Sequence, residues 1–273
     1  MLVLNESTKA FVLQFKAAAP QAQLISGPKG SGLHTLAASL VTQSGTLLST
    51  VTPVRKTPTS LPSISVEQIR SLYEQARTRL NGPHFIVIDD ADTMNHSAQN
   101  ALLKLLEEPN ETIHFILTTH SVEKLLPTIR SRVRHFAVPP ISQQASSELL
   151  KSLGVHDELA VRRLLFIASG LPAELCRMAD SPADFKVLGE RAATAKAFVE
   201  GNTYQRMVVI SSLKDDRSGA IELIEVILLM LRKSIGSMNH SHTIRLIDNL
   251  ISCSESIRAN GNIRVQFMRA ITK

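Results

Sequence analysis

A glycine-rich segment near the N-terminus has the residue types of a phosphate-binding loop. The chain reads Leu-Ile-Ser-Gly-Pro-Lys-Gly-Ser-Gly over residues 24–32, after a strand-like run and before a helical run over residues 34–41. Glycines allow the backbone to curl so that its N–H groups and the helix N-terminus face an anion. Gly27, Gly30 and Gly32 are therefore predicted to shape a P-loop that holds the phosphates of a nucleotide.

Two side chains of a working P-loop are replaced in this chain. The motif reads G-x-x-x-x-G-K-[ST], in which Lys contacts the β- and γ-phosphates and the hydroxyl ligates Mg²⁺. Leu33 stands at the Lys position and His34 at the Ser/Thr position. We expect no hydrolysis at this loop, because an apolar side chain cannot screen the charge of a triphosphate. Weak nucleotide binding stays open, since the backbone donors persist.

Two carboxylates at the end of an apolar run could orient a metal ion and activate water. Residues 84–88 read His-Phe-Ile-Val-Ile, and Asp89 and Asp90 follow them. In a Walker B motif the first acid orients Mg²⁺ and the second, usually Glu, activates water. An isolated pair of acids after a strand is commonly a solvated turn. Behind a P-loop frame, the same pair predicts the second half of a nucleotide site.

A parallel sheet is needed to bring these segments together. The first half of the chain alternates short β-like runs with helical patterns, which is typical of βαβ units. Helices are predicted over residues 66–80 and around the apolar positions of residues 98–106. Strands are predicted over residues 23–26, 45–51, 84–88, 114–118 and 134–138.

A change of pattern near residue 139 predicts more than one domain. The strand-like runs end at Pro139 and Pro140, and the rest of the chain reads as helices. Ser181, Pro182 and Asp184 indicate a second linker. The predicted domains are an α/β core over residues 1–139, a small helical unit over 140–182 and a helical C-terminal domain over 183–273.

Composition is that of a folded, cytoplasmic protein. Hydrophobic residues make up 44% and charged residues 20% of the 273 residues, which is ordinary for globular chains. The longest apolar run, residues 226–231, is too short to cross a bilayer, and we expect no membrane partner. Cys176 and Cys253 lack ligands at metal-binding spacing, so no metal site is expected. The net charge of +6 permits contact with phosphates without requiring it.

Several longer runs carry a family resemblance. Residues 88–95 read Ile-Asp-Asp-Ala-Asp-Thr-Met-Asn, and residues 98–109 read Ala-Gln-Asn-Ala-Leu-Leu-Lys-Leu-Leu-Glu-Glu-Pro. Phe-Ile-Leu-Thr-Thr begins at residue 115, and Leu-Leu-Pro-Thr-Ile-Arg-Ser-Arg-Val begins at residue 125. These runs resemble the bacterial clamp-loader AAA+ subunits, the delta-prime and gamma/tau proteins of DNA polymerase III. The resemblance implies a RecA-like parallel-sheet core, a helical lid and an all-helical C-terminal domain that forms a collar between subunits.

The resemblance also implies roles for single residues. Thr118 or Thr119 matches the sensor 1 position of the family, and Ser131 with Arg132 matches its Ser-Arg-Cys motif, with Val133 in place of Cys. In that family the arginine projects into the ATP site of the neighbouring subunit. A planar, permanently charged guanidinium suits this role. Arg132 is therefore expected to act catalytically in trans rather than within its own chain.

A third replacement implies a subunit that does not hydrolyse ATP. Ala173 matches the sensor 2 position, where hydrolysing members usually carry Arg. Together with Leu33 and His34, this resembles the delta-prime subunit, which supports the loading of the sliding clamp during DNA replication. The implied partners are gamma/tau and delta subunits and, through the complex, the sliding clamp and primed DNA. No cofactor is expected in this chain, and ATP and Mg²⁺ are expected at a neighbouring subunit.

Two other functions stay open. An ATP-hydrolysing subunit of gamma/tau type would need Lys29 to take over the missing contact with the phosphates. A free-standing nucleic-acid-binding module gains little support, because the chain has two Tyr, no Trp and no basic stripe interleaved with aromatic residues.

Overall fold

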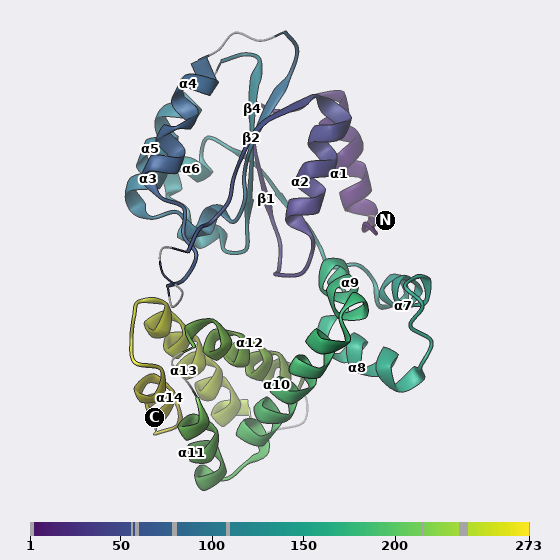
Figure 1. The fold of residues 1–273 in the computed structure, drawn as a ribbon, viewed down its shortest axis with the longest axis vertical. Coiled ribbons are helices and arrows are strands. Elements are labelled where there is room, and N and C mark those ends of the chain that lie inside the picture. The colour runs from purple at the N-terminus through teal and green to yellow at the C-terminus, as the bar shows by residue number, and fades with distance from the viewer. Residues whose placement is uncertain are drawn as a thin grey trace. The chain divides into compact units, whose positions relative to one another are not determined.

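The chain folds into two compact units (Figure 1). A computed structural model of the chain describes residues 3–55, 57, 60–77, 81–107, 110–213, 216–234 and 240–272. The first unit contains Met1–Arg55 and Pro62–Asp180, and the second contains Lys56–Leu61 and Ser181–Lys273.

A five-stranded parallel sheet forms the centre of the first unit. Its order is β2-β3-β4-β1-β5. Each strand begins and ends within one residue of its predicted bounds, which confirms the α/β fold class. The strands are β1 (Ala22–Ser26), β2 (Thr46–Val51), β3 (His84–Ile88), β4 (Ile113–Thr119) and β5 (Arg134–Ala137).

Alternate side chains of the sheet enter two separate cores. Leu24 and Ile86 belong to one cluster of buried residues, and their neighbours Ile25 and Val87 belong to another. This follows from the strand period of two, which points successive side chains to opposite faces. Figure 1 shows helices on both sides of the sheet. They are α1 (Glu6–Ala17) and α2 (Leu33–Ser44) on one side, and α3 (Val66–Arg70), α4 (Leu72–Arg77), α5 (His96–Glu107) and α6 (Pro127–Arg130) on the other.

The helix predicted over residues 66–80 is divided. It forms α3 and α4, with Ser71 between them, and residues 78–80 lie outside the described residues. The hydroxyl of Ser71 donates to the carbonyl of Gln68 at 2.8 Å. A serine that bonds to the local backbone in this way competes with continuous helical pairing.

Three helices complete the first unit after the sheet. They are α7 (Gln143–Ser152), α8 (Glu158–Ala168) and α9 (Pro172–Asp180). Ser142 and Asp157 cap the first two, because their side chains accept hydrogen bonds from first-turn N–H groups. Residues 140–180 thus belong to the same compact unit as the sheet, and their role as a separate lid stays a prediction.

The second unit is helical in all its described elements. Phe198 and Phe267 meet edge to face in its core, with ring centroids 6.0 Å apart. The two units divide between Asp180 and Ser181, where the linker was predicted, but only Ser181 lies outside a helix because α10 begins at Pro182. Proline is tolerated in a first helical turn, where its missing N–H would have no partner. The helices are α10 (Pro182–Glu200), α11 (Thr203–Ser212), α12 (Arg217–Ser234), α13 (His240–Arg258) and α14 (Ile263–Thr272).

Within the described parts of the chain, no helix is both long enough and apolar enough to pass through a bilayer.

Candidate functional site

The carboxyl ends of β1, β3 and β4 bring most of the predicted site residues together. Ser26 of β1 pairs with Thr119 of β4, and Ile88 of β3 pairs with Leu117 of β4. The P-loop and the two acids follow directly after these strand ends. They therefore share one edge of the sheet, which is where open parallel sheets bind ligands.

Two glycines of the predicted P-loop have a backbone conformation that favours glycine. Gly30 and Gly32 have φ angles of +82° and +83°, a region that costs residues with a Cβ atom about 1 kcal/mol. Leu33 is the first residue of α2 and is only 3% exposed. It belongs to the hydrophobic core between the sheet and helices α1 and α2. Its Cδ2 atom would lie 3.2 Å from a Cβ atom added to Gly27. An apolar side chain thus packs against the loop at the position where a working P-loop carries its lysine.

Asp89 is bonded to protein groups through both carboxylate oxygens. The hydroxyl of Thr118 donates to Oδ1 at 2.6 Å, and Nδ1 of His34 lies 3.0 Å from Oδ2. Thr118 also accepts a hydrogen bond from the N–H of Asp90 at 2.9 Å. His34 comes from the position whose hydroxyl would ligate Mg²⁺ in a working loop. The two side chains at the positions that hold Mg²⁺ in a working P-loop site therefore contact each other.

His120 joins the second acid to the loop, and the sequence analysis did not single it out. Its Nδ1 lies 2.8 Å from the carbonyl oxygen of Gly27, and its Nε2 lies 3.2 Å from Oδ1 of Asp90. Both partners are acceptors, so both contacts are hydrogen bonds only when the imidazole carries two protons. The sequence signal that could have identified His120 is its position directly after Thr118 and Thr119, at the carboxyl end of a predicted strand.

Charge and hydrogen bonding shift the pKa values of this pair. Burial of His120 opposes its protonation, but the hydrogen bonds to Asp90 and to the Gly27 carbonyl outweigh burial and raise the pKa of His120. The hydrogen bond from His120 lowers the pKa of Asp90, against the effect of burial. Between the ordinary values of 3.8 and 6.5 both groups are therefore charged, and the contact is an ion pair.

Asp92 holds the end of β4 and the residues after it. One of its oxygens, Oδ1, accepts from the hydroxyl of Thr119 and from the N–H of His120, each at 3.1 Å. Its Oδ2 lies 3.6 Å from Nζ of Lys124. Both threonines at the sensor 1 position therefore donate to carboxylates of their own chain.

The first turn of α9 contacts the loop. The N–H groups of Ala173 and Glu174 donate to the carbonyl oxygen of Gly30 at 2.9 and 3.1 Å. A Cβ atom at Gly30 would lie 2.7 Å from the Cβ of Glu174, so the approach requires glycine. Helix N-termini attract anions through such unpaired N–H groups. In this chain two of them bind a protein carbonyl instead.

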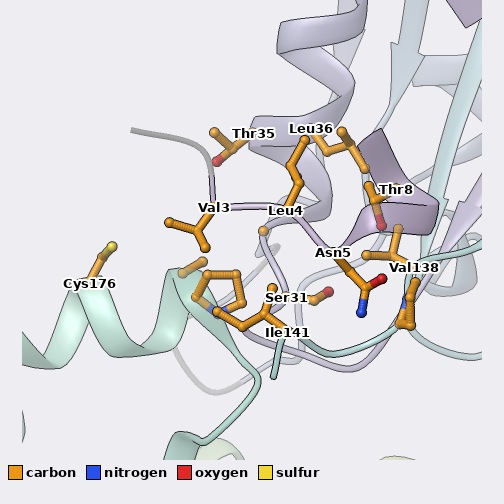
Figure 2. A pocket seen from close by; sticks show the side chains of 14 residues that line it. Val3, Leu4, Asn5, Thr8, Ser31, Thr35, Leu36, Val138, Ile141 and Cys176 are labelled. Atoms are coloured by element: carbon orange, nitrogen blue, oxygen red, sulfur yellow. The ribbon is translucent and has the colours of Figure 1, made fainter. Parts of the chain in front are cut away.

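A pocket of about 290 Å³ lies beside the loop in the first unit (Figure 2). Figure 2 shows Leu4 and Asn5 of the N-terminal segment across from Ser31 of the loop, with Cys176 of α9 further out. Every described residue that lines the pocket is uncharged. The pocket therefore offers no lysine or arginine to a triphosphate.

Arg132 lies apart from this cluster of residues. Its Nη2 lies 2.9 Å from Oε1 of Glu107, and its Nη1 donates to the carbonyl of Thr128 at 3.0 Å and lies 3.4 Å from Oγ of Ser131. Its side chain is 38% exposed. Among the described residues, no hydrogen bond or ion pair joins Arg132 to the P-loop or the acids. The structure thus brings together the residues predicted to form a nucleotide site and leaves the arginine at the surface.

Known sequences similar to this chain include subunits of DNA polymerase III. The family described as DNA polymerase III, delta subunit matches residues 8–142. A protein of Pseudomonas aeruginosa named DNA polymerase III subunit delta' is 36% identical over 118 residues, which cover 42% of this chain and 36% of the relative. The Escherichia coli protein with the same name is 34% identical over 113 residues, which cover 40% of this chain and 34% of the relative. The matched part of the chain thus spans about a third of these relatives.

Comparison with solved structures supports the fold over the whole chain. A gamma subunit-related protein of DNA polymerase III from Thermotoga maritima aligns with a TM-score of 0.54, covering 98% of each chain. Only 17% of the aligned residues are identical, so this likeness concerns the fold alone.

Proposed function

From the match of residues 8–142 to the DNA polymerase III delta family and the likeness to delta' subunits, we propose that the chain is a non-hydrolysing subunit of a DNA polymerase III clamp loader. In this role it supports the ATP-dependent loading of the sliding clamp onto primed DNA. Its direct partners are gamma/tau and delta subunits. ATP and Mg²⁺ bind at a neighbouring subunit, and Arg132 reaches that ATP from outside.

The observation that carries the proposal is the pairing of His34 with Asp89. In a working site the loop hydroxyl ligates Mg²⁺ beside this carboxylate, whereas here an imidazole stands at the hydroxyl position and contacts Oδ2 of Asp89 itself. The positions of Leu33 and Ala173 add no cation to meet the phosphates. These features favour a chain that assists hydrolysis elsewhere over one that hydrolyses ATP itself.

The surface position of Arg132 supports its action in trans. A guanidinium carries five N–H donors, and Arg132 makes two hydrogen bonds through Nη1 and an ion pair with Glu107 through Nη2. Its ion pair with Glu107 is partly exposed, and such pairs contribute about 0–1 kcal/mol. An incoming phosphate can therefore take up the remaining donors at small cost.

The test is ATP turnover with and without the partner subunits. The purified chain alone is expected to show no turnover. In the assembled complex, Arg132→Ala is expected to lower ATP turnover and clamp loading severalfold or more, because an arginine finger contributes roughly 10³-fold at the site it serves. Size-exclusion chromatography should show that the complex stays assembled.

Arg162→Ala is the matched control. Arg162 is also an exposed arginine in a surface ion pair, with Glu158, and its loss is expected to leave turnover unchanged. ATP turnover by the isolated chain that disappears in Asp89→Asn would contradict the non-hydrolysing role. Full activity of the Arg132→Ala complex would contradict the role in trans.

A further inference from the structure

We propose that Glu107 is a positioning residue for Arg132, an inference that rests on the function proposed above. Glu107 is the last residue of α5, and Arg132 follows the end of α6. Oε1 of Glu107 lies 2.9 Å from Nη2 of Arg132, a distance typical of charge-assisted hydrogen bonds. The contact joins the end of α5 to the turn after α6, on the same side of the sheet (Figure 1).

The contacts of Arg132 divide into a local pair and one long-range contact. Nη1 binds Thr128 and Ser131, which lie four residues and one residue earlier in the chain. These contacts fix Nη1 only relative to residues 128–131, which move together with Arg132. Glu107 holds the other nitrogen from a separate helix, so it fixes the plane of the guanidinium relative to the core.

Fixing this plane matters because the side chain is partly exposed. An arginine that is free in solvent samples many rotamers, and ordering it costs entropy when it meets its target. A group that acts on a transition state gains from being held near its working geometry beforehand. Glu107 supplies that restraint, and among the described residues no hydrogen bond is made by Nε of Arg132, so this donor can meet a phosphate.

The exposure of both partners makes the inference testable without loss of the fold. The side chain of Arg132 is 38% exposed and that of Glu107 is 48% exposed. Ion pairs in such positions contribute little to stability. Glu107→Gln is therefore expected to change the equilibrium constant for unfolding by less than about fivefold, which chemical denaturation of the purified chain measures.

The decisive measurement separates kcat from KM in the assembled complex. Glu107→Gln is expected to lower kcat for ATP about threefold to tenfold and to leave KM unchanged, because a misplaced guanidinium weakens only the transition state. Glu107→Asp, which keeps the charge, should restore part of kcat. Glu158→Gln removes a carboxylate from another exposed ion pair with arginine and should match the unmodified complex.

A double variant tests whether Glu107 acts through Arg132. In an Arg132→Ala complex, adding Glu107→Gln is expected to lower kcat no further. A further loss in that background would overturn the inference, as would a normal kcat in Glu107→Gln beside a depressed kcat in Arg132→Ala. If Arg132→Ala alone leaves turnover unchanged, the proposed function fails first, and the two failures are thereby distinguished.

Discussion

Nδ1 of His34 lies 3.0 Å from Oδ2 of Asp89, so the first residue after the P-loop's lysine position is bonded to the acid that would orient Mg²⁺. The hydroxyl of Thr118 takes the other oxygen. Each oxygen of the Asp89 carboxylate thus has one polar contact with a side chain of its own chain.

Removing this imidazole is expected to leave the chain stable and unable to bind nucleotide tightly. The side chain of His34 is 58% exposed, so His34→Ala should change the free energy of unfolding by less than about 1 kcal/mol. Leu33 still offers no cation to the phosphates in this variant. Calorimetric titration with ATP, with and without Mg²⁺, checks the prediction. Micromolar binding that depends on Mg²⁺ would count against it.

The ion pair between His120 and Asp90 is expected to make stability depend on pH. The raised pKa of His120 means that its contribution is complete below the ordinary value near 6.5 and is lost as pH rises through the folded value. The lowered pKa of Asp90 means that its contribution is present above the ordinary value near 3.8 and is lost as pH falls through the folded value. The pair therefore stabilises most between these two ordinary values.

His120→Gln is the variant that measures this effect. Its deficit in the free energy of unfolding, relative to the unmodified chain, should be largest near pH 5 to 6 and smaller near pH 9. Urea unfolding at the two pH values gives the comparison. An equal deficit at both values would show that the charge of His120 contributes nothing.

Restoring the two lost P-loop side chains is not expected to restore hydrolysis. The double variant Leu33→Lys, His34→Thr would place an ammonium where a side chain is 3% exposed in an apolar core, at a cost of about 2 kcal/mol or more. Leu33→Met keeps the volume and should cost less than about 1.5 kcal/mol. Thermal unfolding and ATP turnover test both variants. Sustained turnover by the double variant would show that position 173 needs no arginine.

Contact between α9 and the P-loop is expected to be sensitive to one methyl group. Gly30 and Gly154 both have a φ angle of +82°, so Ala costs about 1 kcal/mol of backbone strain at either position. Only at Gly30 would the added Cβ meet another atom, 2.7 Å away on Glu174, whereas nothing lies within 4 Å at Gly154. Gly30→Ala should therefore destabilise the chain by about 1 to 3 kcal/mol more than Gly154→Ala.

Hydrogen exchange locates that difference. The N–H groups of Ala173 and Glu174 bind the carbonyl of Gly30, and they should lose protection in Gly30→Ala but not in Gly154→Ala. Equal protection in the two variants would mean that the loop does not hold α9.

The sequence predicted the elements whose pattern is local. Residues 84–88 form a strand with the predicted bounds, because an unbroken apolar run bounded by a proline and two acids fits a buried parallel strand. Helix α1 was not predicted, although Asn5 caps it and Thr8, Phe11 and Phe15 form its buried face. The predicted linker lies where the two units divide but is shorter than expected, because Pro182 begins α10, and proline at the start of a helix cannot be told from proline in a loop by sequence alone.

The site was predictable where a motif fixes a position along the chain. Gly27, Asp89 and Thr118 come together because each follows or ends a strand of one parallel sheet. The contacts between side chains at the site were not predictable, since they depend on distances between segments far apart in sequence. His120, directly after β4, contacts the Gly27 carbonyl, and Glu107 of α5 contacts Arg132 in the turn after α6.

Asp90 has a left-handed backbone, with a φ angle of +49° and a ψ angle of +50°. Short polar residues such as Asp and Asn tolerate this region, because their side chains bond to the local backbone, whereas longer residues pay about 1 kcal/mol or more for it. Glutamate, the usual water-activating acid at this place in a Walker B motif, would carry that penalty. Regaining catalysis through mutation would thus have to cross a conformational obstacle at this residue, in addition to replacing the side chains that have been lost.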